Sequence, residues 1–378
     1  MTIRTRGSGE GSIYRRKDGR WAASLSLGYE GTRRVRKTYY GKTRAEVADK
    51  LNRAISDQRN GLPLADERQT LEAYLAWWVA TALPGRVRPS TRSSYESNIR
   101  LHILPTIGQL AVARVRAMDV QHLINLKLEE GLSPRTVQYI HAILRRALSD
   151  AEKWGAVPRN VAKLVDPPKV SARTAAKPLS VAEARSLLEA ATNHRLYALY
   201  AVALACGLRR GEALALRWTD VDLERRMLTV ARTVGRIDGK LTFSEPKSHR
   251  SNRTIVLPDI CGRALQAHRA HQAKERLAAR RTWTETDLVF PSTVGTVIEP
   301  RNLTRQFHSL CEEAGIGRRR FHDLRHTCAT LLLAQGVSPR VAMEILGHSR
   351  ISTTMEIYSH VGIELQHEAA GKIDSALA

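Results

Sequence analysis

The apolar pattern changes along this chain of 378 residues, from alternation near the start to helical spacing further on. Residues 12–14, 21–27 and 33–40 alternate as short strands do. Later segments repeat apolar residues every three or four positions, which predicts helices. One ordinary core does not hold a chain of this length. The sequence therefore predicts a multidomain, mostly α protein with small β elements.

The first predicted domain covers residues 1–62 and combines a three-stranded sheet with one helix. Asp-Gly at 18–19 and Glu-Gly at 30–31 supply the turns between the strands. Helical spacing then runs over 43–58. The Gly-Leu-Pro run at 61–63 marks its end.

The second predicted domain covers residues 63–165 and is helical. Ser90 is expected to cap a helix that Pro105 stops, and Ser133-Pro134 is expected to open another. The helices predicted from these signals span 90–103, 119–130 and 134–154.

A linker rich in Pro, Ala and Lys follows at 166–178, and a mixed α+β domain is predicted for 179–378. Ser180 caps its first helix, and an apolar helix is expected over 196–206. The strands predicted in this domain span 227–233, 240–243 and 254–257.

The net charge of the chain limits the classes of partner that it can bind. Lys and Arg number 60 against 37 Asp and Glu, a net charge of +23 that is spread over all three domains. Such an excess favours a polyanionic partner, with nucleic acid ahead of an anionic membrane surface. The start of the chain does not resemble a signal peptide, and no apolar run is long enough to span a bilayer. Four widely spaced cysteines argue against a disulfide framework, so we expect a cytoplasmic protein without a membrane partner.

Four segments of the third domain carry polar residues suited to chemistry. In ACGLRRGEALALRW, at 205–218, glycines bracket Arg209, and Glu212 follows on a helix face. In SEPKSHRSNRTIVLP, at 244–258, a polar turn contains Lys247. Taken alone, the first segment fits a core helix with a surface arginine equally well, and the second fits an ordinary basic loop better.

The third segment, FHDLRHTCATLLLAQG at 321–336, places His322 and Arg325 three residues apart on one helix face. His322 and His326 also have the spacing of a zinc pair, with Asp323 between them. That chemistry needs a glutamate and a third ligand, and a guanidinium between the ligands disfavours it. We therefore expect no metal here.

The fourth segment, EILGHSRISTTMEIYSH at 344–360, contains His348 after a helix end and Tyr358 ten residues later. Alone, Tyr358 reads as a half-buried aromatic residue. Together the four segments match a phosphodiester site, because arginine forks bind phosphate oxygens and a tyrosine can attack phosphorus. His322 could act as a base toward the tyrosine, and Lys247 could protonate the leaving oxygen.

These residues resemble the signature of tyrosine recombinases of the phage integrase type. In chain order that signature is an Arg after Gly-Leu, a Lys in a hairpin, His-x-x-Arg, a His after Leu-Gly, and a Tyr. The matching positions here are Arg209, Lys247, His322, Arg325, His348 and Tyr358, with Glu212 as the supporting acid. Hairpin lengths vary within this signature, and Arg250 and Arg253 lie close to Lys247.

The resemblance extends over the whole chain. It implies an arm-type DNA-binding domain at 1–62, a core-binding domain at 63–165 and a catalytic domain at 179–378. The patterns at 11–14 and 18–21 are typical of the arm domain. Its candidate DNA contacts are Arg15, Arg16, Lys17, Arg20, Arg33, Arg34, Arg36 and Lys37.

The resemblance implies a recombinase that integrates and excises a prophage or integrative element through a 3′-phosphotyrosyl intermediate, with no cofactor. The implied partners are double-stranded DNA, a homotetramer on that DNA, a host DNA-bending protein and a directionality factor. The alternatives are a type IB topoisomerase, which shares the chemistry, and a non-catalytic DNA-binding protein. A metal-dependent transposase would need a carboxylate triad, and the sequence offers no compelling one.

Overall fold

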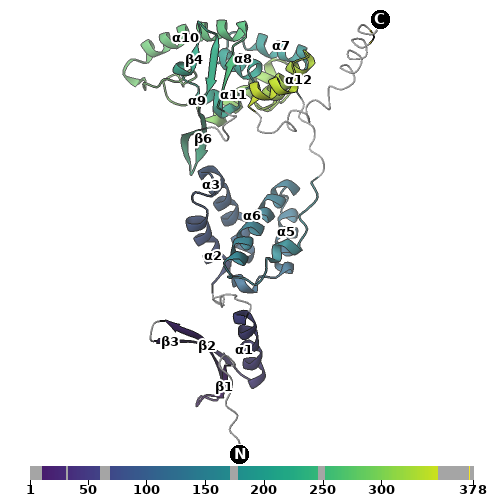
Figure 1. Ribbon diagram of the computed structural model, residues 1–378. Helices are drawn as coiled ribbons and strands as arrows, with labels where there is room; N and C mark the ends of the chain where they lie inside the picture. The colour runs from purple at the N-terminus through teal and green to yellow at the C-terminus, as the bar shows by residue number, and fades with distance from the viewer. Residues whose placement is uncertain are drawn as a thin grey trace, which may run out of the picture. The chain divides into compact units, whose positions relative to one another are not determined.

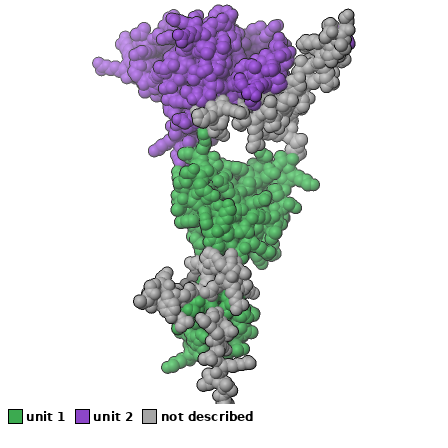
Figure 2. Space-filling view, viewed as in Figure 1, with its two compact units in different colours: residues 1–171 green, residues 172–378 purple. Residues whose placement is uncertain are grey.

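The computed structural model describes residues 11–30, 33–59, 69–170, 178–245, 252–347 and 374. The chain divides into two compact units, Met1–Ser171 and Ala172–Ala378 (Figure 2). The first unit contains one apolar core beneath its sheet and another among its helices, and the second unit has a larger core of its own.

The first described strands form a three-stranded antiparallel sheet, as predicted (Figure 1). Its strands are β1 (Ser12–Arg15), β2 (Trp21–Glu30) and β3 (Arg33–Gly41), and α1 (Arg44–Arg59) follows. Gly19 makes the first turn with φ 82°, a conformation that glycine adopts without strain. Alternate residues of β2 and β3 face α1, as the period of two requires. The core between sheet and helix is formed by Ala23, Leu25, Tyr39, Val47, Leu51 and Ala54.

The helical part of the first unit follows. Its elements are α2 (Leu71–Trp77), the π-helical η1 (Trp78–Ala82), α3 (Pro89–Asn98), the π-helical η2 (Ile99–Ile103), α4 (Leu104–Ile107), η3 (Val112–Arg114), α5 (Ala117–Glu129), α6 (Pro134–Lys153) and η4 (Val161–Leu164). The prediction for α6 is confirmed, since Ser133 caps it and Pro134 is its first residue. Asp150 of α6 accepts hydrogen bonds from Trp78 Nε1 at 2.8 Å and from both terminal nitrogens of Arg86. These bonds connect α6 to the first helices of the bundle.

Two predictions about the helix near residue 90 were wrong. Arg88, not Ser90, is the N-cap, and Pro89 takes the first helical position, where its missing N–H costs no bond. Pro105 does not stop the helix. The N–H of Leu104 bonds to the carbonyl of Ile99, five residues back, so the helix widens just before the proline and continues through α4.

The second unit is built around α8 (Tyr197–Ala205), which is apolar on all sides and buried from Ala198 to Leu204. It contacts α7 (Val181–Ala190), α9 (Arg210–Ala215), α10 (Asp259–Ala279) and α12 (Asp323–Ala334). Further helices are α11 (Pro300–Glu313), α13 (Pro339–Leu346) and the 3₁₀ turns η5 (Trp218–Asp220) and η7 (Arg280–Thr282). Ser180 caps α7, as predicted.

The described strands of the second unit form two separate sheets. One has the order β4 (Val221–Asp222), β5 (Met227–Val230) and β8 (Arg253–Val256), and the other pairs β6 (Thr233–Ile237) with β7 (Lys240–Ser244). The single strand predicted over 227–233 is therefore two strands. The chain leaves the first sheet after Val230, and β6 packs against α9. A Cβ on Gly211 would lie 2.5 Å from the carbonyl oxygen of Val234.

Candidate active site

Arg209 stands at the start of α9 as its N-cap residue. Its Nη1 donates to Oε1 of Glu212 at 2.6 Å, and its backbone N–H donates to Oε2 of the same carboxylate at 3.0 Å. Glu212 sits at the third helical position, as in a capping box. Nη2 of Arg209 also donates to the carbonyl of Gly347 at 3.2 Å. The start of the helix therefore sets the direction of the guanidinium.

Arg325 lies on α12 with only 2% of its surface exposed. Its Nη1 donates to the carbonyl of Gly207 at 2.7 Å. Within the part of the chain that the structure describes, its buried Nη2 has no hydrogen-bond partner. Leaving a buried donor unpaired costs roughly 1–3 kcal/mol. Such a donor suits an acceptor that a ligand brings.

Positive charge dominates the surroundings of Arg325. Burial lowers the pKa of its guanidinium to about 9, and the nearby charges of Arg209 and Arg253 act in the same direction. Burial by itself raises the pKa of Glu212, but the charges of Arg253 and Arg209 outweigh it and keep that pKa below its ordinary value. Three guanidiniums share one ionised carboxylate, so the cluster carries a surplus of positive charge.

Two glycines bring backbone carbonyls to these arginines. Gly207 has φ 62° and Gly347 has φ 63°, both in the left-handed region that favours glycine. A Cβ on Gly207 would lie 2.4 Å from Cδ2 of Leu346. The helix end predicted just before His348 is confirmed, because Gly347 is the left-handed C-cap of α13.

His322 precedes α12 as its N-cap residue, three positions before Arg325. Its ring meets the ring of His326 edge to face, with centroids 4.9 Å apart. Desolvation lowers the pKa of His322 to about 4, and the charges of His326 and Arg325 lower it as well. The imidazole is therefore neutral at pH 7, and it keeps an exposed surface. A neutral imidazole can accept a proton.

Three of the predicted site residues, Lys247, His348 and Tyr358, lie outside the described residues. The structure describes the elements that flank them. β7 ends at Ser244 and β8 begins at Arg253, on the two sides of Lys247. α13 ends immediately before the segment that holds His348 and Tyr358.

Arg253 belongs to the described cluster, although the sequence marked only its closeness to Lys247. It is 8% exposed, and its Nη2 donates to Oε2 of Glu212 at 3.1 Å. The sequence signal that could have identified Arg253 is the alternation of buried and exposed positions in β8. Arg253 and Ile255 occupy the buried positions of that strand, and Thr254 and Val256 the exposed ones.

The predicted DNA contacts of the N-terminal sheet fall in different places. Arg15 and Lys37 pair in register with Trp21 and Leu25, so they share the face that α1 covers. Arg36 pairs with Ser26 on the open face. Arg16, Lys17 and Arg20 flank the first turn, and Arg33 and Arg34 begin β3, where their side chains are outside the description.

The open face of this sheet also carries two aromatic rings. Tyr14, Ala22 and Tyr40 form one row across the three strands. Tyr14 is 46% exposed and Tyr40 is 49% exposed, while Ala22 between them is buried. The guanidinium of Arg16 lies 5.2 Å from the centre of the Tyr40 ring. This row, together with Arg36, forms a polar and aromatic surface.

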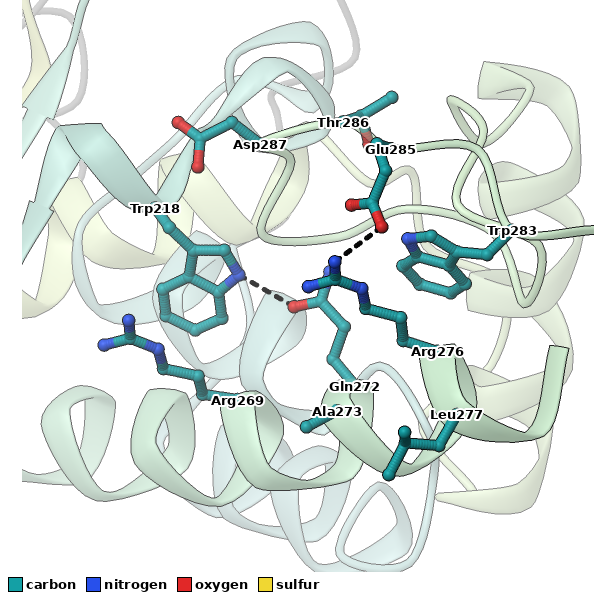
Figure 3. A pocket seen from close by; sticks show the side chains of 10 residues that line it. All are labelled: Trp218, Arg269, Gln272, Ala273, Arg276, Leu277, Trp283, Glu285, Thr286 and Asp287. Atoms are coloured by element: carbon teal, nitrogen blue, oxygen red, sulfur yellow. Dashed lines mark hydrogen bonds and ion pairs between the residues drawn. The ribbon is translucent and has the colours of Figure 1, made fainter. Parts of the chain in front are cut away.

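A separate hollow of about 850 Å³ lies along α10 (Figure 3). Trp218 and Trp283 lie at its two sides, and Trp218 Nε1 donates to Gln272 at 2.7 Å. Arg276 at this hollow is paired with Glu285 at 2.6 Å. None of the residues that line it belongs to the arginine cluster, so the two are different sites.

Across the described residues, no helix is both long enough and apolar enough to cross a membrane.

Comparison with known proteins shows which family the chain resembles. Residues 177–364 match the model of the phage integrase family, and residues 70–128 match the N-terminal SAM-like domain of phage integrases. The solved structures of similar fold include the following two integrase complexes. An integrase of the transposon Tn1549 in complex with a circular intermediate DNA has TM-score 0.67 and 20% identity, over 81% of this chain and 99% of that one. A lambda integrase dimer bound to a COC′ core site has TM-score 0.58 and 18% identity, over 76% and 95%.

Curated relatives are similar over nearly the full length. A XerC-like tyrosine recombinase of Caldanaerobacter subterraneus subsp. tengcongensis is 31% identical, over 88% of this chain and 90% of the relative. An integrase of Streptomyces ambofaciens is 32% identical over 94% and 92%. The ICEBs1 integrase of Bacillus subtilis is 24% identical over 97% and 100%. The chain therefore belongs to the phage integrase family of tyrosine recombinases.

Proposed function

We propose that this recombinase cleaves and rejoins double-stranded DNA through a 3′-phosphotyrosyl intermediate, and that it integrates and excises a mobile element. The observation that carries the proposal is the buried Arg325, which lies beside Arg209 and whose Nη2 has no hydrogen-bond partner among the described residues. A phosphodiester oxygen supplies the acceptor that this donor lacks, and its negative charge offsets the positive surplus of the cluster.

In the first step, the Tyr358 oxygen attacks the scissile phosphorus and the bond from phosphorus to the 5′ oxygen breaks. The products are a 3′-phosphotyrosyl enzyme and a DNA end with a free 5′-hydroxyl. Arg209 and Arg325 stabilise the extra negative charge of the pentavalent transition state. Lys247 donates a proton to the leaving 5′ oxygen.

His322 takes the tyrosine proton, with His348 as a further hydrogen-bond donor to the phosphate. A pKa of about 4 leaves the His322 imidazole unprotonated at neutral pH, as a base requires. The pKa of free tyrosine is about 10, so attack needs a base or a cationic pocket. The negative phosphate also makes proton uptake by His322 easier once DNA is bound.

In the second step, the 5′-hydroxyl of a partner strand attacks the phosphotyrosine and releases Tyr358. One phosphoester replaces another in each step, so no nucleotide is consumed. Arginine and lysine supply the positive charge that the phosphate needs, so the proposed chemistry uses no cofactor.

The division of labour that we propose follows the boundaries 1–62, 63–165, 166–178 and 179–378, for arm binding, core binding, linker and catalysis. The open face of the N-terminal sheet, with Arg36, Tyr14 and Tyr40, supports a DNA contact there, because such a sheet fits a major groove. The two DNA complexes of similar fold support double-stranded DNA as the partner. A homotetramer, a host DNA-bending protein, a directionality factor and a cytoplasmic location complete the proposal.

A nicked suicide substrate tests this function. The DNA comes from the flank of the encoding gene, and the reaction contains a chelator. Wild-type protein is compared with Tyr358→Phe on a denaturing gel. We expect a slow-migrating covalent adduct with the wild type alone, and equal binding of DNA by both proteins.

Three outcomes would contradict the proposal. An adduct formed by Tyr358→Phe would show that another residue is the nucleophile. Binding without any adduct, on genomic fragments that the protein itself selects, would indicate a DNA-binding protein without catalysis. Relaxation of supercoiled plasmid without site preference would favour a type IB topoisomerase instead.

A further inference from the structure

Arg253 joins three segments that are distant in the sequence. It is the first residue of β8, six positions after Lys247. Its Nη2 donates to Oε2 of Glu212 in α9 at 3.1 Å, and its Nε donates to the carbonyl of Ile345 at 2.6 Å. Ile345 lies in the last turn of α13, three positions before His348. One buried guanidinium therefore connects the start of β8, the first helix of the site and the segment that leads to His348.

Glu212 is held from two sides by this arrangement. Oε1 accepts from Arg209 and Oε2 accepts from Arg253, while the backbone N–H of Arg209 completes the set. Glu212 is 4% exposed and Arg253 is 8% exposed, so water does not substitute easily for either partner. A carboxylate restrained at both oxygens has little freedom to rotate. The Arg209 guanidinium that it holds is restrained with it.

Charge explains why this position needs an arginine. Removing one partner of a buried ion pair leaves the other charge uncompensated. Arg253 is first among the charges that keep the pKa of Glu212 low against the effect of burial. Lysine would keep the charge but not the planar fork, which bonds to a carboxylate with one nitrogen and to a carbonyl with another.

We propose that Arg253 is a positioning residue for DNA cleavage, acting on Arg209 through Glu212. This inference rests on the proposed function. Arg253 does not itself contact the phosphate in the proposal. It keeps Glu212 ionised and oriented, and thereby holds Arg209 toward the scissile phosphate.

The test is a double-mutant cycle on single-turnover formation of the covalent adduct by the full-length protein. Its members are the wild type, Arg253→Met, Glu212→Gln and the combination. We expect Arg253→Met to slow adduct formation roughly 10- to 100-fold, the range of a strong pairwise coupling. In the Glu212→Gln background the same change should cost less than about threefold, because the carboxylate through which it acts is already gone. Equal effects of Arg253→Met in both backgrounds would overturn the proposal.

The pH profile separates positioning from a general loss of packing. Without Arg253 the pKa of the buried Glu212 rises. The cleavage rate of Arg253→Met should therefore fall at acidic pH, where the wild-type rate does not. The loss should disappear in the double variant, where residue 212 does not titrate. A profile parallel to that of the wild type would count against a role through Glu212.

Arg226 offers a control with the same kinds of bonding partner, at a position where half of the arginine side chain is exposed. It also bonds to a carbonyl and a carboxylate, Leu257 at 3.2 Å and Asp259 at 2.5 Å, but it lies outside the site cluster. Arg226→Met should leave the cleavage rate and its pH profile unchanged. A rate loss equal to that of Arg253→Met would show that any such arginine has the same effect, and would overturn the assignment.

A thermal melt shows whether Arg253→Met folds. If it does not fold, Arg253→Lys is the variant to test. The lysine variant should fold, bind core DNA within about threefold of wild type, and cleave at least tenfold more slowly, because one ammonium does not replace the fork. Full activity of Arg253→Lys would overturn the positioning role. A wild-type protein that forms no adduct would contradict the proposed function itself, whereas normal cleavage by the Arg253 variants would contradict this inference alone.

Discussion

Arg325 donates its Nη1 to the carbonyl oxygen of Gly207 at 2.7 Å, across 118 positions of sequence. The bond ties α12 to the turn that precedes α9. It uses one side of the guanidinium and leaves Nη2 for another acceptor. The same turn delivers Arg209, so a single backbone carbonyl orients one arginine of the site immediately beside the other.

Replacement of Arg325 should reduce cleavage much more than binding. Arg325→Ala removes a donor aimed at developing charge, which typically slows a reaction by about 10²- to 10³-fold. Arg325→Lys should recover little, because lysine cannot bond to Gly207 and a phosphate in fork geometry. Single-turnover adduct formation measures the rate and a gel shift measures binding. A cleavage rate within a few fold of wild type for either variant would refute the role of the fork.

Gly207→Ala should destabilise the protein and also slow cleavage. The residue would adopt φ 62°, and its Cβ would displace the buried side chain of Leu346. We expect a loss of about 1–3 kcal/mol in the free energy of unfolding, measured by urea denaturation. Gly239→Ala is the control, since Gly239 has φ 76° but open space around the new Cβ. A cleavage defect in Gly239→Ala as large as that in Gly207→Ala would argue against a specific role of the Gly207 turn.

His322 should titrate far below an ordinary histidine in the protein without DNA. Its pKa of about 4 lies below the value of about 6.5 in an unfolded chain. Between these values the unfolded state binds more protons, so this group lowers stability as pH falls from about 6.5 to 4. An NMR titration of the histidine rings reports the pKa, and His322→Gln should make the loss of stability with falling pH less steep. A core-site duplex should raise the pKa, and an unchanged value with DNA bound would contradict contact between His322 and the phosphate.

Among the acidic residues of the helical part of the first unit, Asp150 should be the one whose replacement lowers folding stability most. Its side chain is 5% exposed and accepts from Trp78 and from both terminal nitrogens of Arg86. Burial raises its pKa, but these hydrogen bonds and the charge of Arg86 hold the pKa below its ordinary value. The stabilisation is therefore present above pH 4 and is lost as pH falls through the lowered pKa.

Asp150→Ala should cost roughly 1–3 kcal/mol of folding free energy, because the indole N–H of Trp78 loses its acceptor. Asp150→Asn keeps an acceptor and should lose less. Thermal melts at pH 7 compare the two variants, and Asp119→Ala is a more exposed acidic control on α5. An alanine variant as stable as wild type would show that the buried bonds contribute nothing net.

Local signals succeeded where neighbouring residues decide the structure. The caps at Ser133 and Ser180 and the alternation of the first strands concern contacts within a few positions, so their outcome could be predicted. Pro105 was misjudged because its effect depends on the hydrogen-bond register of the preceding turn. The π-helical segment before it accommodates the proline, and the residue pattern did not predict that segment.

The sequence by itself determined the order and spacing of Arg209, His322 and Arg325, on which the proposed chemistry rests, because these are a property of the chain. Only the tertiary structure decided how they are held. Arg253 reaches Glu212 and Ile345, and Gly207 reaches Arg325, through contacts between segments separated by 41 to 118 positions. Packing around α8 brings those segments together, and burial then turns ordinary side-chain charges into a cluster with shifted pKa values. A local sequence pattern gives neither the distance between remote residues nor their dielectric environment. The positioning residues of this site could therefore be identified only from the fold.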